Sequence, residues 1–129
     1  MSARAIVGLL GLAAAAVVVF AGCGEGQGVL RPGVPASWNP TRGHMLIEFY
    51  GCGACHVIGG VTNANGHVGP PLTSFRTRYR NIAGVLPNTP RNVVRWIMNP
   101  PRFLHDVDMP NLDVRRPGAQ DIAAYLYRQ

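Results

Sequence analysis

The hydrophobic positions of this chain recur at helical spacing in three segments, residues 42–51, 90–99 and 119–127. The second segment has the clearest start, because Thr89 can cap free backbone N–H groups and Pro90 suits a first helical turn. Long stretches rich in Gly, Asn and Pro separate the segments. No segment reads as a convincing strand, so the pattern predicts an all-α domain of short helices and long loops.

The first of these segments has boundaries of its own. Asn39 and Pro40 form a plausible helix start, and Gly51 can end the helix. One face of this helix would carry Leu46, Phe49 and Tyr50. We therefore expect that face to pack on the rest of the domain.

The N-terminus shows a different pattern, an unbroken apolar run at residues 5–21 after the basic Arg4. This arrangement is typical of a secretory signal, and its length is near the lower limit for a membrane span. Phe20-Ala21-Gly22-Cys23 is similar to a bacterial lipobox, with Phe20 where leucine is usual. Three outcomes stay open: acylation of Cys23 after cleavage, an ordinary cleaved signal, and an uncleaved anchor. All three place the domain on the periplasmic side of a bacterial inner membrane.

The chain thus divides into a signal segment (1–22), a Gly- and Pro-rich tether (23–40) and one domain (41–129). So small a domain commonly needs a staple beyond its apolar core. The formal net charge of +6 comes from arginine, since the chain has no lysine. The arginines are scattered, and no recognition helix or aromatic platform accompanies them, so nucleic-acid binding is not expected.

Cys52-Gly53-Ala54-Cys55-His56 is the most informative motif of the chain. Cys-x-x-Cys-His is the attachment motif of c-type haem, in which both thiols form thioethers and the histidine becomes the proximal iron ligand. Two intervening residues allow one short turn to present both sulfurs to one porphyrin edge. The motif predicts one covalently bound haem c, which would also serve as the apolar staple.

Two other readings of the same cysteines are weaker. A structural zinc site needs four ligands, usually from two such pairs, and the third cysteine, Cys23, lies in a different kind of sequence. A thioredoxin-like redox pair requires a βαβ context. Residues 44–50, just before Cys52, favour a helix rather than a strand. Nor does any nucleophile–base pair suggest an enzyme.

A sixth iron ligand is expected from the segment just before the last helix. Met109 lies in an irregular stretch that Pro110 stiffens, and such a loop can present a thioether to the second haem face. Met45 and Met98 fall in predicted helices, where methionine more often fills the core. His105 is the second candidate, and a histidine ligand would give a lower potential than methionine.

The order of these motifs resembles class I cytochrome c. The resemblance covers residues 41–129 and is carried by the haem motif, Gly69-Pro70-Pro71-Leu72, Met109-Pro110 and a terminal helix ending Ala124-Tyr125-Leu126. It implies the class I cytochrome c fold around one haem. It also implies that the first and last helices cross, bringing Phe49 near Tyr125.

The same resemblance implies roles for three further residues. The Pro70 carbonyl would accept a hydrogen bond from His56, which fixes the ring and raises ligand basicity. Trp96 stands where the family often has an aromatic side chain packed on the haem near the methionine. Arg78 would pair with a haem propionate, although solvation of Arg76, Arg78 and Arg80 in a polar loop is an equal alternative.

Residues 84–100 are similar to the cytochrome c domain fused to subunit II of some haem-copper oxidases. That resemblance implies a membrane-tethered electron carrier that passes single electrons to a terminal cytochrome oxidase. A quinol-oxidising complex would supply the electrons. The alternative is a permanently bound haem c subunit of a respiratory or dehydrogenase complex. A haem enzyme or gas sensor would need an open sixth position, against which Met109 argues.

Overall fold

The computed structural model describes residues 33–129, so the signal segment, Cys23 and most of the tether lie outside the described residues. The described elements are α1 (Pro40–Phe49), the 3-10 turn η1 (Cys52–Ala54), α2 (Phe75–Arg78), β1 (Asn81–Ile82), β2 (Leu86–Pro87), α3 (Pro90–Met98), the 3-10 turn η2 (Pro100–Arg102) and α4 (Arg116–Leu126). Within residues 33–129, no helix combines the length and hydropathy needed to cross a bilayer.

Local capping explains where the two clearest helices begin. The Asn39 side chain accepts a hydrogen bond from the backbone N–H of Arg42, and the Thr89 side chain accepts one from that of Asn92. Both helices carry proline in the first turn, where the missing N–H costs nothing. These two starts were predicted. The last helix begins earlier than predicted, at Arg116, because Pro117 lies within its first turn rather than before it.

A small hairpin corrects the expectation that the domain has no strand. β1 pairs antiparallel with β2, with Ile82 opposite Leu86. Three residues connect the strands, and the Val85 backbone N–H donates to the Ile82 carbonyl at 3.0 Å. Ala83 and Gly84, the central residues of this turn, have φ values of 47° and 74°. Positive φ at both central positions is what a type I′ turn requires. The usual Asn-Gly signal is absent, and the strands are too short to show alternation, so the sequence pattern gave no sign of them.

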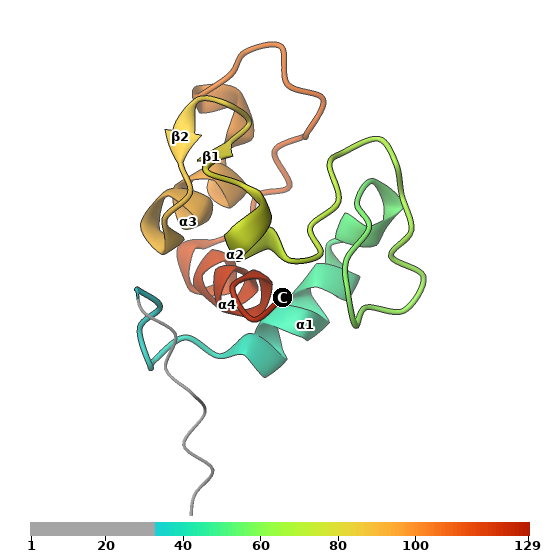
Figure 1. Cartoon of the computed structure of the whole chain (residues 1–129), viewed down its shortest axis with the longest axis vertical. Coiled ribbons are helices and arrows are strands. Elements are labelled where there is room, and N and C mark those ends of the chain that lie inside the picture. The colour runs from blue at the N-terminus through green and yellow to red at the C-terminus, as the bar shows by residue number, and fades with distance from the viewer. Residues whose placement is uncertain (1–32) are drawn as a thin grey trace, which may run out of the picture.

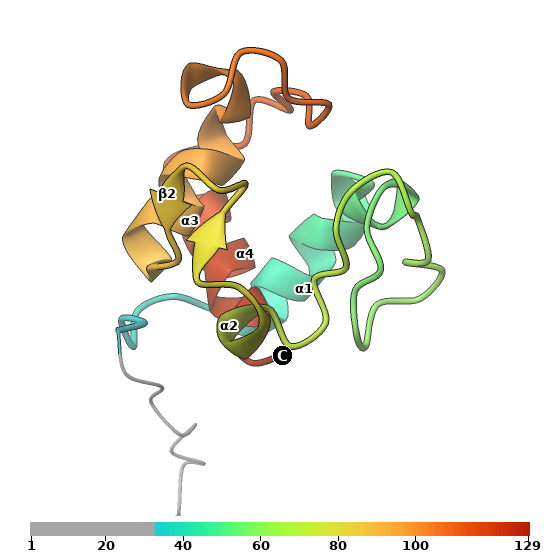
Figure 2. The ribbon, with the colours of Figure 1, turned by 45° about the horizontal axis from the view of Figure 1, so that its top comes forward.

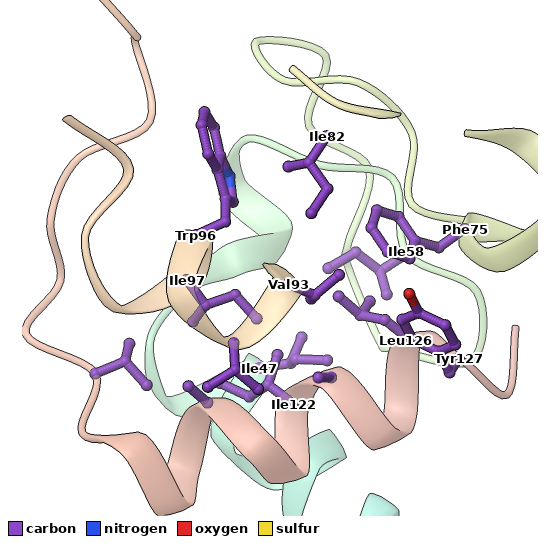
Figure 3. Close-up of a cluster of buried hydrophobic side chains, with 14 of the residues drawn as sticks. Ile47, Ile58, Phe75, Ile82, Val93, Trp96, Ile97, Ile122, Leu126 and Tyr127 are labelled. Carbon is purple, nitrogen blue, oxygen red and sulfur yellow. The ribbon is translucent and has the colours of Figure 1, made fainter. Parts of the chain in front are cut away.

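The core forms where α4 lies between α1 and α3 (Figure 1; Figure 2). α3 and α4 contribute Val93, Val94, Ile97, Ile122 and Leu126, and Ile47 of α1 packs with them (Figure 3). Burial of these side chains is the main stabilisation of the domain. The three helices therefore form the packed frame from which the long loops extend.

The buried face of α1 agrees in part with the expected one, because Leu46 and Tyr50 pack against the core but Phe49 does not. Phe49 is 79% exposed and packs edge-on against Tyr50, whereas Ile47 is 1% exposed. The reason is the helix crossing: a Cβ on Gly43 would lie 2.0 Å from the backbone oxygen of Asp121. Only glycine permits this approach, so Gly43 and Ile47, one turn apart, form the contact stripe. The expected contact between Phe49 and Tyr125 is wrong.

Asp121 of α4 connects the start of α1 to α4 through hydrogen bonds and an ion pair. Its side chain is buried, accepts a 2.7 Å hydrogen bond from the Asn39 backbone N–H, and forms an ion pair with Arg42. A buried carboxylate is tolerated only when it is paired in this way. The contact fixes the direction in which α1 leads into the Cys-x-x-Cys-His segment.

Candidate functional site

The Cys-x-x-Cys-His motif forms a tight turn directly after α1. Gly51 ends the helix in the left-handed region, with φ of 67°, and residues Cys52–Ala54 form the single 3-10 turn η1. The backbone N–H of His56 donates to the Cys52 carbonyl at 3.1 Å. One short turn thus presents Cys52, Cys55 and His56 in succession.

The loop that follows the motif folds back over it. The Gly66 backbone N–H donates to the Gly53 carbonyl at 3.0 Å. A Cβ on Gly53 would lie 2.7 Å from the Cα of Ala64, and one on Gly66 would lie 2.2 Å from the Ala54 carbonyl oxygen. Both glycines are therefore required by close backbone approach. The sequence indicated a Gly-rich loop here but not that it packs on the motif.

Burial raises the pKa of the Cys52 thiol. A backbone hydrogen bond lowers it by less, and the nearby Cys55 adds a still smaller increase. A reactive redox thiol needs a lowered pKa, because the thiolate is the nucleophile. The environment of Cys52 thus favours a thiol that stays protonated at neutral pH. This is evidence against a thioredoxin-like pair.

His56 is held in one orientation by its neighbours. Its Nδ1 lies 2.7 Å from the Pro70 carbonyl oxygen, which can only accept, so Nδ1 carries the proton. The ring lies directly against Gly69, whose backbone N–H donates to the Cys55 carbonyl at 2.8 Å. A Cβ on Gly69 would lie 2.3 Å from His56 Cε1. This arrangement leaves Nε2 with a lone pair available to a metal.

A partly open apolar cleft brings the separate segments together. Its lining consists of Ile47, Cys52, His56, Ile58, Leu72, Ile97, Met109, Leu112, Val114, Ile122 and Leu126. The cleft thus has mostly aliphatic walls and three candidate iron or haem contacts: a thiol, an imidazole and a thioether.

Met109 reaches the cleft from the irregular segment before α4, and Trp96 holds its sulfur. Trp96 is 8% exposed, and its indole Nε1–H donates to the Met109 sulfur at 3.2 Å. The resemblance placed an aromatic side chain near the methionine, but the hydrogen bond was not predicted. His105, the second candidate ligand, is exposed and is not among the cleft-lining residues.

The remaining predicted site residues lie outside the cleft lining. Cys55 is half-buried beside Cys52 in the motif turn. Arg78, at the end of α2, is exposed and forms no ion pair with any carboxylate of the described residues. Its pairing with a haem propionate stays a prediction. Across residues 33–129, no group of three or more His, Cys, Asp or Glu side chains is arranged to hold a metal ion.

The contact between Gly69 and His56 predicts a specific variant effect. Gly69→Ala should displace the imidazole, because a methyl group cannot share the space of the ring. We expect haem-loaded Gly69→Ala to lose its six-coordinate low-spin absorption spectrum and to unfold at a lower temperature. Gly84→Ala is the control, since its added methyl group meets nothing within 4 Å, although it acquires left-handed strain that Gly69→Ala does not. It should keep the spectrum of the wild type. An unchanged spectrum in Gly69→Ala would contradict the placement of His56.

Comparison with known proteins finds a similarity to one respiratory protein. No protein-family profile matches the chain. A curated relative, cytochrome c oxidase subunit 2 of Alkalihalophilus pseudofirmus, is 31% identical over 93 residues, which cover 71% of this chain. The chain is similar to part of a cytochrome oxidase subunit. It spans 26% of the length of that relative. The similarity is compatible with a role in respiratory electron transfer.

Proposed function

We propose that this chain is a membrane-tethered monohaem c-type cytochrome that carries single electrons in a respiratory chain. The observation that carries the proposal is the cleft itself, which gathers Cys52, His56 and Met109 from distant segments within aliphatic walls. When bound, haem c would supply one-electron redox chemistry at its iron. The chain's own residues determine how that group is held and what can reach it.

Each polar group of the site has a distinct task in this proposal. Cys52 and Cys55 would form the two thioethers, and the Nε2 atom of His56 and the sulfur of Met109 would bind the iron. The Pro70 carbonyl keeps the imidazole oriented, and Trp96 keeps the thioether oriented. If both residues bind the iron, the chain itself would occupy the positions that a substrate would need. The arrangement therefore favours an electron carrier over an enzyme.

The aliphatic lining of the cleft has a second consequence. Ile47, Ile97, Ile122 and Leu126 place no polar atom against a bound macrocycle. Exclusion of water lowers the local dielectric and disfavours the more charged oxidation state. Together with a methionine ligand, this should give a higher potential than a bis-histidine site.

The partner and the location are part of the same proposal. The relative is named as an oxidase subunit, so a terminal cytochrome oxidase is the electron acceptor we propose, with a quinol-oxidising complex upstream. The chain would lie on the periplasmic side of a bacterial inner membrane. It would be held there through Cys23 or its apolar N-terminal segment, which tethers the haem at high effective concentration.

A second candidate is a haem subunit bound permanently to an oxidase or dehydrogenase complex. It is favoured by the fact that the similar region of the relative is part of a longer oxidase subunit. In that case the chain would exchange electrons only within its complex. The two candidates share the same haem site. They differ in whether the chain docks reversibly on its partner or stays bound to it.

Salt dependence distinguishes the two candidates. The net charge of +6 should steer a mobile cytochrome to an acidic docking site, and added salt screens that attraction. We expect solubilised oxidase to oxidise the reduced protein rapidly, at a rate that falls roughly tenfold from low to high salt. Stopped-flow absorbance would measure this rate. A salt-independent rate in a co-purified complex would indicate the permanent subunit, and no electron exchange with any oxidase would refute the proposed partner.

A further inference from the structure

We propose that Tyr79 is a positioning residue for His56, acting through the Pro70-Pro71 segment. The inference rests on the proposed function, in which His56 ligates the haem iron. The Tyr79 hydroxyl donates to the Pro71 carbonyl oxygen at 2.7 Å. The preceding carbonyl, that of Pro70, accepts from His56 Nδ1 at the same distance. Two adjacent carbonyls thus connect a tyrosine outside the cleft to the imidazole inside it.

The chemistry of the diproline makes this connection consequential. Neither Pro70 nor Pro71 has a backbone N–H, so the peptide unit between them can be oriented by hydrogen bonds only through the Pro70 carbonyl. The Pro71 carbonyl belongs to the next unit, which it shares with the Leu72 N–H. The flanking peptides are tied down by Gly69, which donates to the Cys55 carbonyl, and Leu72, which donates to the Val57 carbonyl at 2.7 Å. The Pro70 carbonyl between them takes its direction from how firmly its neighbours are held. Tyr79 supplies a bond to this segment from the α2 side of the domain.

Tyr79 can serve as an anchor because it is itself held. The Asn88 side-chain amide donates to the Tyr79 carbonyl at 2.9 Å and to the Phe75 carbonyl at 3.2 Å. The Phe75 ring, which is buried, packs on Tyr79 with centroids 5.8 Å apart. Tyr79 therefore does not depend on the diproline for its own position.

The support of Tyr79 extends to the C-terminal helix. The Tyr127 hydroxyl donates to the Asn88 side-chain oxygen at 2.8 Å, and the Tyr127 ring lies near Phe75 (Figure 3). Burial raises the pKa of Tyr127 to about 12, so this hydroxyl stays protonated at physiological pH. Hydrogen bonds joined by the covalent structure of Asn88, Tyr79 and the Pro70-Pro71 segment therefore lead from the end of α4 to His56.

This anchor is expected to affect the basicity of the His56 imidazole as an iron ligand. A firmly held Nδ1–H bond raises the basicity of a metal-bound imidazole. A more basic imidazole stabilises ferric over ferrous iron and lowers the potential. Loosening the Pro70 carbonyl should therefore raise the potential and expose the Nδ1 proton to exchange with solvent.

Tyr79→Phe tests the inference with a matched control. The variant keeps the ring against Phe75 and removes only the hydroxyl. Tyr125→Phe removes an equally half-buried hydroxyl that donates to another loop carbonyl, that of Gly59, at 2.8 Å. The two variants should lose similar thermal stability. Only the bond of Tyr79 leads to the diproline.

The measurements are made on the haem-loaded protein. Exchange of the His56 Nδ1 proton is followed by NMR in the reduced state, and the midpoint potential by redox titration. For Tyr79→Phe we expect roughly fivefold faster exchange, the effect of losing one ordinary hydrogen bond, together with a raised potential. Tyr125→Phe should match the wild type in both. Equal exchange and equal potential in the two variants would overturn the positioning role, whereas a wild-type protein without covalent haem would overturn the proposed function instead.

Discussion

Replacing both Cys52 and Cys55 with alanine is expected to leave the purified protein without covalently bound haem. The wild type should carry one haem per chain that acid acetone does not extract, because thioether bonds survive denaturation. Pyridine haemochrome spectra of the denatured proteins measure both outcomes. The matched control is Cys23→Ala, which changes the third cysteine and should retain the haem.

The same double variant should also destabilise the domain. Ile58, Leu72 and Val114 line the cleft together with α1 and α4, and an unfilled cleft deprives them of packing partners. A loss of about 3–5 kcal/mol is expected, comparable with deletion of a large core side chain. Thermal unfolding followed by circular dichroism would detect it. Acid-acetone extraction of the haem from the wild type, or full haem retention by the double variant, would refute thioether attachment.

Replacing Met109 with alanine is expected to remove the sulfur ligand without removing the haem. The oxidised wild type should show the weak near-infrared absorption that marks sulfur on ferric haem, and Met109→Ala should lack it. The potential should fall by on the order of 0.1 V, within the ~0.8 V range that axial ligands set. The direction follows because a thioether favours ferrous iron more than water or nitrogen ligands do.

Met98 and His105 provide the controls for this assignment. Met98 is partly buried in α3 and lies outside the cleft lining, and His105 is exposed. Alanine at either position should leave the near-infrared band and the potential as in the wild type. Loss of the band in Met98→Ala, with its retention in Met109→Ala, would show that the wrong methionine was chosen. Loss of ligation in His105→Ala would indicate a bis-histidine site.

Short-range sequence signals predicted the parts of this protein that depend on local geometry. The Cys-x-x-Cys-His spacing defines its turn because five consecutive residues contain all the chemistry. Asn39 and Thr89 mark helix starts because a capping side chain bonds only a few residues ahead. The hydrogen bond from His56 to the Pro70 carbonyl was indicated by the resemblance to class I cytochrome c and not by residue spacing. Capping and turn preferences do not connect residues so far apart in the chain.

Tertiary structure alone decided which side chains meet across the fold. Helical spacing could not tell that Ile47 rather than Phe49 faces α4, because the choice depends on the close approach at Gly43. Nor could it reveal the bonds from Trp96 to Met109 and from Tyr79 to Pro71, since those partners are brought together by packing. The physical reason is the separation of the residues along the chain. Capping and turn preferences act within a few residues, whereas contacts between distant segments shape the cleft. The sequence by itself thus determined the chemistry of the site, and the packing of α1, α3 and α4 determined its shape and its supports.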